Sequence, residues 1–412
     1  MRILLATDCY PPPLIGGRDL HVRMLAHELV RRGHEVQVVT LAGSGGQRKE
    51  IDGDVTVHRL GGWSRALNRF YADPERPWHP TLPDPGIVRS VSRLLRDFRP
   101  HVIHAHSWIV HSLLPLSPSG GPALVVTMHE YGLICSKNSY MHGERVCEGP
   151  ALLKCLRCSK DQYGVLRGAA LTGGVFLSQP LLRRIDRLIA VSNFVAEANQ
   201  PLLRPGGPGI EVIPPFLDDE ILALDPMTAR RPDFVPSEGD YVMFAGALSR
   251  LKGIDTLLDA YVGLNPQVPL VVAGLNNTGG RVDLPRGVVA VENVSHDDVL
   301  LAWANCAVAV VPSKWPDPSP LSAMEAMAAR VPVVASAIGG LRDLVVDQVT
   351  GILVGPGDVV ALRAAIAELL ADPGRRAQMG EAGRNRAADW TAAAVVPRIE
   401  GVYQDAVESA RR

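Results

Sequence analysis

The chain has 412 residues, of which 47% are hydrophobic and 21% charged, a balance typical of a soluble globular protein. Its length suggests two domains of ordinary size. Basic and acidic residues nearly cancel, 42 against 43, so no basic field points to a nucleic-acid partner. No apolar run approaches the ~20 residues that a membrane span needs, although contact with a membrane surface remains open.

The first residues, MRILLATD, predict a strand rather than a signal peptide, because Asp8 interrupts the apolar run too soon. A PPPLIGG turn follows, then a helical pattern in DLHVRMLAHELVRRG that stops at Gly33, then the strand HEVQVVT. This βαβ order predicts a parallel sheet, to which we assign further strands at 101–106, 123–129 and 187–192.

Residues 200–240 are rich in proline and glycine, which places a linker at 213–238. After the linker the alternation restarts, and Ser295 and Asp298 have the spacing that caps a helix. Strands are expected in the segments YVMFAG, PLVVAG, VVAV, AVAVVP, VPVVAS and GILV.

The predicted fold is α/β, with two Rossmann-like, parallel-sheet domains that face a central cleft. The domains are 1–212 and 239–393, and a C-terminal helix at 394–412 is expected to pack back on the first. Ligands of such sheets bind at the carboxyl ends of the strands. Six cysteines without an export signal favour a reducing compartment, so we expect a cytoplasmic location.

The segment SKWPDPSPLSAMEAMAARVPVVAS, 313–336, holds the main candidate site. Ser319 is a good N-cap and Pro320 suits the first helical position, so the amides of Leu321 and Ser322 are expected to be free. A helix start with free amides attracts phosphate. The alternative is an ordinary capped helix whose amides meet water.

Glu325 lies one turn further along the same face of an otherwise apolar helix. A buried carboxylate needs hydrogen-bond donors. A protein arginine would supply them, and so would the diol of a ribose whose phosphates rest at the helix start. The second interpretation predicts a nucleotide site.

Two acids in this segment, Asp317 and Glu325, are separated by seven residues and followed by AMAARVPVVASAIGG. The pattern resembles the retaining glycosyltransferases of the type 4 family, which have the GT-B fold, and the resemblance spans nearly the whole chain. It implies that Glu325 holds the ribose of a nucleotide-sugar donor and that Asp317 contacts the donor sugar. It also implies that the helix start at Ser319, Leu321 and Ser322 meets the phosphates. The family's usual first acid is Glu, so Asp317 leaves the sugar undefined.

The segment GALSRLKG, 246–253, carries the second family motif. In the family, an Arg directly after the first Gly and a Lys before the last hold the donor diphosphate. Lys252 matches this pattern, Ala247 replaces the Arg, and Arg250 is the candidate substitute. The alternative for Lys252 is a surface lysine, although a helix start is an unfavourable place for a cation.

Gly16 and Gly17 follow the first strand, where glycine permits a positive φ and close approach of a ligand. By the resemblance, this pair closes over the donor phosphates, and the alternative is a plain turn. The full G-x-G-x-x-G run is missing, so a dinucleotide cofactor is disfavoured.

Histidines end two neighbouring strands, in HAHSW and TMHEY. The resemblance implies that His129 acts near the donor sugar and the acceptor pocket. His104 and His106 are assigned a structural or acceptor-side role, and Glu130 is placed on the acceptor side. The family generally needs no metal, because lysine, amides and the helix dipole neutralise the leaving diphosphate.

Four cysteines, at positions 135, 147, 155 and 158, follow the second of these strands. Cys155 and Cys158 have the C-x-x-C spacing of a zinc knuckle, whereas Cys135 and Cys147 do not. A structural zinc site and isolated buried thiols are both open interpretations, and no cofactor is expected for catalysis.

These motifs together predict a retaining hexosyltransferase whose catalytic residues are His129, Lys252, Asp317 and Glu325. The expected partners are a nucleotide-sugar donor and a glycan or small-molecule acceptor. A nucleotide-sugar epimerase on the same fold and a nucleotide-binding homologue without catalysis are the alternatives. The sequence does not fix the base, the sugar, the acceptor or the oligomeric state.

Overall fold

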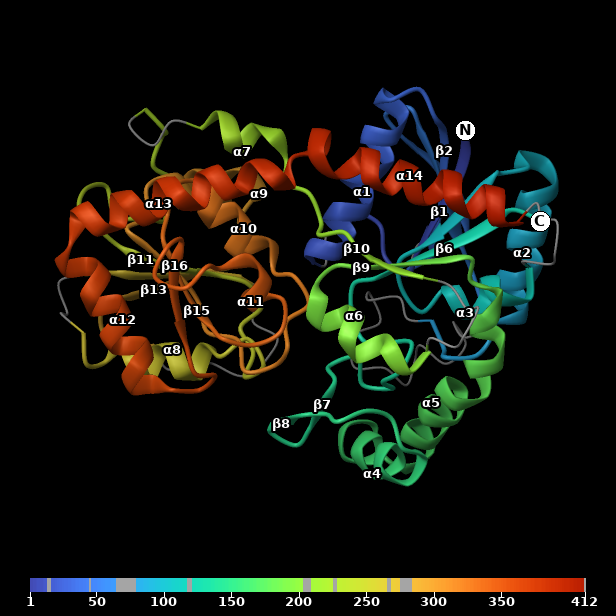
Figure 1. Ribbon diagram of the computed structural model, residues 1–412, viewed down its shortest axis with the longest axis horizontal. Helices are drawn as coiled ribbons and strands as arrows, with labels where there is room; N and C mark the ends of the chain where they lie inside the picture. The colour runs from blue at the N-terminus through green and yellow to red at the C-terminus, as the bar shows by residue number, and fades with distance from the viewer. Residues whose placement is uncertain are drawn as a thin grey trace. The chain divides into compact units, whose positions relative to one another are not determined.

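The computed structural model describes residues 1–12, 16–43, 46–63, 79–116, 121–202, 209–224, 228–264, 268–274 and 284–410. They form two compact units, one of Met1–Pro214 with Val395–Arg412 and one of Pro215–Ala394 (Figure 1). Part of the expected PPPLIGG turn, residues 13–15, lies outside the described residues. Within those ranges, the structure has no helix whose length and apolar character would let it cross a bilayer.

The sheet of the first unit has eight strands in its described part, in the order β10-β9-β6-β5-β1-β2-β4-β3. All neighbours are parallel except β3 and β4, so the expected purely parallel sheet is corrected at this edge. The strands are β1 (Arg2–Thr7), β2 (Glu35–Leu41), β3 (Arg48–Asp52), β4 (Val55–Leu60), β5 (Val102–Ala105), β6 (Ala123–Met128), β9 (Arg187–Ala190) and β10 (Ile210–Val212).

The predicted strands β1, β2, β5, β6 and β9 are confirmed, whereas β3, β4 and β10 were not predicted. Every residue of β5 and β6 is buried, because the central strands of a parallel sheet are covered on both faces and therefore read as continuous apolar runs. The antiparallel β3–β4 hairpin turns through Gly53, whose φ is +59°. The Asp52-Gly53 pair was the sequence signal for it.

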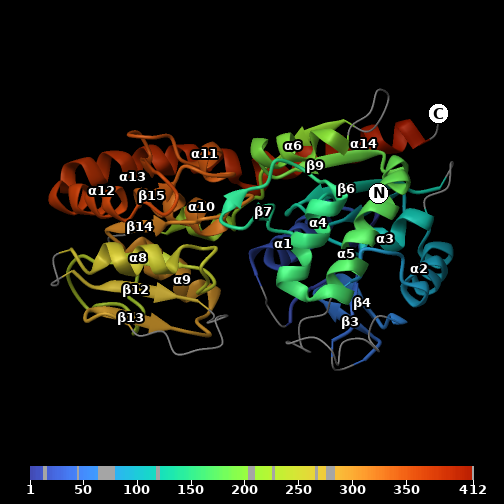
Figure 2. The same ribbon diagram turned by 90° about the horizontal axis from the view of Figure 1, so that it is seen from below.

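Helices and two short strands complete the first unit (Figure 2). They are α1 (Gly17–Arg31), α2 (Pro85–Phe98), α3 (Val110–Leu113), β7 (Met141–His142), β8 (Arg145–Val146), α4 (Leu152–Tyr163), α5 (Val165–Ser178), α6 (Asn193–Asn199) and the C-terminal α14 (Ala392–Ala410). Short 3-10 turns lie at Leu114–Leu116, Gln179–Arg184 and Gln200–Leu202. From Val395 on, α14 belongs to this unit. Its Glu400 pairs with Arg32 and His34, at 2.9 and 2.7 Å.

The second unit has a six-stranded, fully parallel sheet in the order β13-β12-β11-β14-β15-β16, as described. All six strands were predicted. They are β11 (Val242–Ala245), β12 (Leu270–Ala273), β13 (Val288–Val291), β14 (Val308–Val311), β15 (Val333–Ser336) and β16 (Gly351–Val354). The helices are α7 (Asp219–Ala223), α8 (Ile254–Tyr261), α9 (His296–Ala304), α10 (Leu321–Ala328), α11 (Leu341–Leu344), α12 (Val359–Ala371) and α13 (Pro373–Ala387), with a 3-10 turn at Ala388–Trp390.

Two apolar layers cover the faces of this second sheet. Successive residues of β11 alternate between them, so Met243 packs in one layer with Trp303, whereas Phe244 packs in the other. The predicted linker, 213–238, contributes Leu217 and Val235 to the layer that contains Met243 and Trp303. The predicted cap of α9 is confirmed, since Ser295 Oγ accepts a hydrogen bond from the Asp298 amide at 3.1 Å.

Asp84 is the N-cap of α2, and its buried carboxylate accepts hydrogen bonds from the amides of Gly86 and Trp63, at 2.8 and 2.9 Å. Alanine at this position would leave both amides without that acceptor. We therefore expect D84A to lower the free energy of unfolding by about 2 kcal/mol. D84N keeps an acceptor oxygen and should lose far less. Urea unfolding measures both, and equal losses would contradict the capping role.

Candidate functional site

Two loops at the carboxyl end of the second sheet lie directly against each other. One follows β11 and ends at Gly253, and the other follows β14 and begins at Pro312. Gly253 has a φ of +74°, and a Cβ there would lie 1.8 Å from the Pro312 carbonyl oxygen, so only glycine fits. The Lys314 amide also donates to the Leu251 carbonyl at 2.8 Å. The contact therefore brings the two predicted motifs together.

Lys252 and Asp317 form an ion pair across this contact. Lys252 Nζ donates to Asp317 Oδ2 at 2.6 Å, and Ser313 Oγ donates to the same oxygen at 3.1 Å. The Asp317 side chain is 5% exposed, whereas that of Lys252 is 27% exposed. The carboxylate is thus buried with two donors, whereas the Lys252 side chain stays partly exposed.

A third loop, after β15, fixes the backbone of Asp317. The Gly340 amide donates to the Asp317 carbonyl at 2.7 Å. Gly339 has a φ of +58°, and a Cβ there would lie 2.5 Å from the carbonyl carbon of Pro316. Three strand ends of the sheet therefore determine where Asp317 lies.

The start of α10 differs by one residue from the prediction. The helix begins at Leu321, and Pro320, with ψ at 116°, takes the N-cap position expected for Ser319. The Ser319 hydroxyl lies 3.9 Å from Met324 Sδ and caps no amide. The assignment of Ser319 as N-cap is therefore wrong. Among the described residues no side chain caps this helix, so the amides of Leu321 and Ser322 are the unpaired donors of its first turn.

Glu325 is buried, with 7% of its surface exposed, one turn inside α10. Its Oε2 accepts a hydrogen bond from Trp303 Nε1 at 3.3 Å, and its Oε1 lies 3.7 Å from His296 Nε2. Burial raises the pKa of this carboxyl group, and His296 and Trp303 oppose the rise. In the described part of the chain its ion-pair partner is this histidine, and no arginine takes that place. The arginine alternative is therefore not supported.

Arg250 is the expected substitute for the arginine missing at Ala247. Its side chain is 78% exposed, with Nε 3.6 Å from Asp255 Oδ2. Asp255 also accepts from Lys314 at 2.6 Å. The exposed guanidinium has room to move, and its role in phosphate binding stays a prediction.

His104 and His106, at the carboxyl end of β5, have different surroundings. His104 is fully buried, and both ring nitrogens are bonded at 2.7 Å, Nδ1 to the Tyr403 hydroxyl and Nε2 to the Thr127 hydroxyl. Burial lowers the pKa of His104 to about 3. This geometry favours the structural alternative for His104.

His106 contacts the predicted catalytic His129, which follows β6. Nδ1 of His106 lies 3.0 Å from Nε2 of His129, and the His21 and His129 ring centroids are 5.4 Å apart. Burial lowers the pKa of both His106 and His129 well below the usual value, and neighbouring histidines add to the effect. Both rings are therefore neutral at physiological pH.

Charged groups surround this histidine cluster. Glu130 accepts a hydrogen bond from Arg18 at 3.0 Å, and Arg18 also meets Asp19 at 3.3 Å. Burial raises the pKa of Asp8 to about 6, although Arg18 and the Ser107 hydroxyl oppose the rise. Sequence analysis did not single out Asp8 or Arg18. The available signals were the position of Asp8 at the end of a strand and that of Arg18 at a helix start, directly after a glycine pair.

Gly16 and Gly17 begin α1, beside the end of β1. The φ of Gly16 is −174°, which is ordinary extended backbone, so Gly16 does not use the positive φ that glycine permits. A Cβ at Gly16 would meet nothing within 4 Å. The fold itself therefore does not require glycine at position 16. The approach of a ligand to Gly16 and Gly17 stays a prediction.

The four cysteines at 135, 147, 155 and 158 are free thiols. In the ranges that the structure describes, no three His, Cys, Asp or Glu side chains are grouped closely enough to hold a metal ion. Cys158 Sγ lies 3.5 Å from Lys137 Nζ, and burial raises the pKa of Cys135 and Cys155. The side-chain geometry of the described residues therefore does not support the zinc interpretation.

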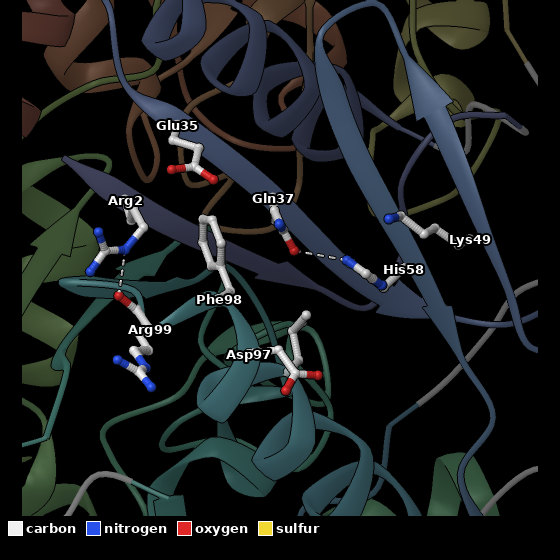
Figure 3. A pocket seen from close by; sticks show the side chains of 9 residues that line it. Arg2, Glu35, Gln37, Lys49, His58, Asp97, Phe98 and Arg99 are labelled. Carbon is white, nitrogen blue, oxygen red and sulfur yellow. Dashed lines mark hydrogen bonds between the residues drawn. The ribbon is translucent and has the colours of Figure 1, made fainter.

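A groove of about 610 Å³ lies at the amino ends of strands of the first sheet, whereas the histidine cluster lies at their carboxyl ends (Figure 3). Arg2 and Glu35, which begin β1 and β2, lie in its wall, together with Gln37, Lys49, His58, Leu94, Asp97, Phe98 and Arg99. Figure 3 shows Gln37 accepting from His58, at 2.9 Å, and Arg2 donating to the Arg99 carbonyl. The amino ends of parallel strands are not where such folds bind substrate.

Family models match most of the chain. Residues 16–215 match the glycosyl transferase 4-like domain, and residues 228–386 match glycosyl transferases group 1. D-inositol 3-phosphate glycosyltransferase 1 of Catenulispora acidiphila is 30% identical, over 75% of this chain and 73% of that protein. The chain is a type 4 family glycosyltransferase. Glycogen synthase of Mycobacterium tuberculosis is 28% identical, over 95% of this chain and 92% of its own length.

Solved structures agree on the fold of this glycosyltransferase. Sucrose-phosphate synthase of Thermosynechococcus elongatus superposes with a TM-score of 0.76 at 24% identity, covering 99% and 100% of the two chains. Anabaena HepE, in a complex with UDP-glucose, superposes with a TM-score of 0.68 at 18% identity, covering 98% and 99%. The enzyme thus has two Rossmann-like, parallel-sheet domains of the GT-B class. It is a retaining hexosyltransferase that uses a nucleotide-sugar donor, in a family that generally needs no metal.

Gly339 allows a test of how the strand-end loops hold Asp317. Gly239 serves as the control, because its φ is also positive, at +80°, but a Cβ there would meet open space. We therefore expect the control variant G239A to destabilise the protein by about 1 kcal/mol. G339A adds a backbone clash and should lose about 2 kcal/mol more. It should also lose transfer activity, because Asp317 is displaced. Thermal unfolding measures both variants, and equal midpoints would contradict the crowding around Asp317.

Proposed function

We propose that this glycosyltransferase moves a hexose from a nucleoside diphosphate hexose to a glycan or small-molecule acceptor in the cytoplasm. The second unit would hold the donor, and the first unit would present the acceptor. The observation that carries this proposal is the meeting of Lys252, Asp317 and the uncapped start of α10 at one end of one sheet. A single ligand that joins a diphosphate to a sugar would satisfy all three, with phosphate oxygens for Lys252 and the helix start and a hydroxyl for Asp317.

The donor diphosphate would rest on the amides of Leu321 and Ser322 and on Lys252. Each of these supplies positive charge to the leaving group, the amides through the helix dipole and Lys252 through its ammonium. Because Lys252 is paired with Asp317, the phosphates would compete with this carboxylate for the ammonium group. Asp317 would then be free to accept a hydrogen bond from a sugar hydroxyl. Because its side chain is shorter than that of the Glu usual in the family, this hydroxyl would have to lie close to the Asp317 backbone.

The ribose would lie one turn inside α10, against Glu325. Among the described residues, Oε1 of Glu325 has only His296 at 3.7 Å, a separation too long for a hydrogen bond, so this buried carboxylate has unused acceptor capacity. Two ribose hydroxyls would use it, while Trp303 keeps its bond to Oε2. The family resemblance and the UDP-glucose complex of HepE support a nucleoside diphosphate hexose as the donor.

On the first unit, Gly16 and Gly17 would approach the donor phosphates, and His129 would lie near the sugar. His106 and Glu130 would line the acceptor side. A neutral His129 donates or accepts a hydrogen bond but adds no charge. The leaving diphosphate would then take the acceptor's proton, as the family resemblance implies, which accounts for the lack of a dedicated general base among the predicted residues.

Product analysis with a panel of nucleotide sugars tests this function. Sugar transfer to an added acceptor, with release of the nucleoside diphosphate and retention at the anomeric carbon, supports the proposal. An isomerised donor without acceptor would indicate an epimerase instead. Binding without turnover across donors and acceptors would indicate a nucleotide-binding homologue.

Lys252 offers a test with a matched control in the same unit. K252A removes a charge-assisted contact to the diphosphate, so we expect kcat/KM to fall about 100-fold. K314A breaks an ion pair of the same 2.6 Å length, with Asp255, and should change kcat/KM less than about fivefold. Steady-state kinetics at limiting donor measure both. Equal losses would reject the placement of the diphosphate.

Glu325 makes donor binding sensitive to pH. Because burial raises its pKa above 4.5, its protonation begins at a higher pH than for an exposed glutamate. The protonated group accepts fewer bonds from ribose, so donor affinity should fall as the pH is lowered toward that pKa. E325Q should bind more weakly at neutral pH and lack this dependence. Calorimetric titration with a nucleotide sugar measures it, and parallel pH curves would contradict the role.

A further inference from the structure

Exposed large hydrophobic side chains gather on the hairpin formed by α4 and α5. Fifteen such side chains occur in the described residues, and five of them lie between Leu152 and Leu177. Figures 1 and 2 show α4 and α5 side by side at the surface of the first unit. Single exposed apolar residues are ordinary, whereas a gathering on one element indicates a contact surface.

The outward face of α5 is apolar along its length. Leu166 is 88% exposed and Leu177 is 70% exposed. Between them Ala169, Ala170 and Gly173 follow at helical spacing and are exposed or half-buried, so all five share one face.

The opposite face of α5 is also apolar in large part, and it packs into the unit. Leu171 and Val175 are 2% exposed there. A helix that is apolar on both sides is normally covered on both sides. In the part of the chain that the structure describes, only one of these sides is covered.

Basic side chains accompany this apolar face. Residues 152–178 contain Lys154, Arg157, Lys160 and Arg167 but only one acid, Asp161. Arg157 and Lys160 are exposed and share a face of α4 with Leu153, which is 73% exposed. Among the described residues, neither Arg157 nor Lys160 pairs with a carboxylate. Two cations without a carboxylate partner, on one helix face with the exposed Leu153, match a surface that is both apolar and anionic.

We propose that the α4–α5 hairpin docks on the surface of an anionic lipid bilayer. The outward face of α5, with Leu166 and Leu177, enters the boundary between headgroups and acyl chains. Arg157 and Lys160 meet the lipid phosphates, which attract basic segments close to the membrane. A second copy of this chain fits less well, because two like-charged hairpins would face each other. The enzyme would bind the surface without crossing it.

Vesicle co-sedimentation of the full chain tests this inference without reference to sugar transfer. We expect binding to phosphatidylcholine vesicles that contain phosphatidylglycerol and at least tenfold weaker binding to phosphatidylcholine alone. Binding should weaken in about 1 M salt, where charges are screened beyond ~3 Å. L166E/L177E and R157Q/K160Q should each bind at least tenfold more weakly. V360E, which changes a 73% exposed valine on α12, is the matched control and should bind like the wild type.

Three results would overturn the proposal. The first is no binding to either kind of vesicle, and the second is an equal loss of binding in V360E. The third is a wild-type dimer that L166E/L177E converts to a monomer, without vesicle binding, which would assign the face to a second copy. Circular dichroism spectra and melting temperatures of each variant show whether it is folded. Because this experiment measures lipid binding and not sugar transfer, a negative result would not contradict the proposed donor site.

Discussion

The close contact between Gly253 and the Pro312 carbonyl determines the geometry of the donor-side residues. A side chain of any size at position 253 would separate the loops after β11 and β14. The contact holds Lys252 within 2.6 Å of Asp317, although 65 residues separate them in sequence. The buried Asp317 carboxylate in turn keeps an ammonium group at the edge of the sheet before any ligand arrives. Preorganisation of this kind means that little has to move when charge develops on a leaving phosphate.

Much of this architecture was predictable because parallel strands have a simple signature. Central strands such as β6 and β14 are buried on both faces, so each appears as a short apolar run between turn residues. The edge hairpin of β3 and β4 is half-exposed and charged, with Arg48, Lys49 and Glu50 in β3, and it lacks that signature. Only its Asp-Gly turn marked it.

The candidate site was predictable in its residues but not in its contacts. The motif spacing identified Lys252, Asp317 and Glu325, whereas the two side chains that face Glu325 come from α9, a helix whose pattern carries no functional signal. The packing of α9 against α10 determines that Trp303 and His296 meet this carboxylate. The cap of α10 was misplaced by one residue because Pro320 suits both the N-cap and the first helical position. Local preference alone does not distinguish these registers.

The return of α14 to the first unit has a consequence for how the chain is made. His104, in the middle of the first sheet, takes one of its two hydrogen bonds from Tyr403, only nine residues before the end of the sequence. Glu400 likewise pairs with Arg32 and His34 near the beginning. During synthesis, which proceeds at roughly 5–20 residues per second, the interior of the amino-terminal domain therefore stays incomplete until α14 has been translated. The strands of the second domain, the last of which ends at Val354, are all translated before α14, so that domain has its complete sheet while the first domain still lacks the residue that bonds to His104.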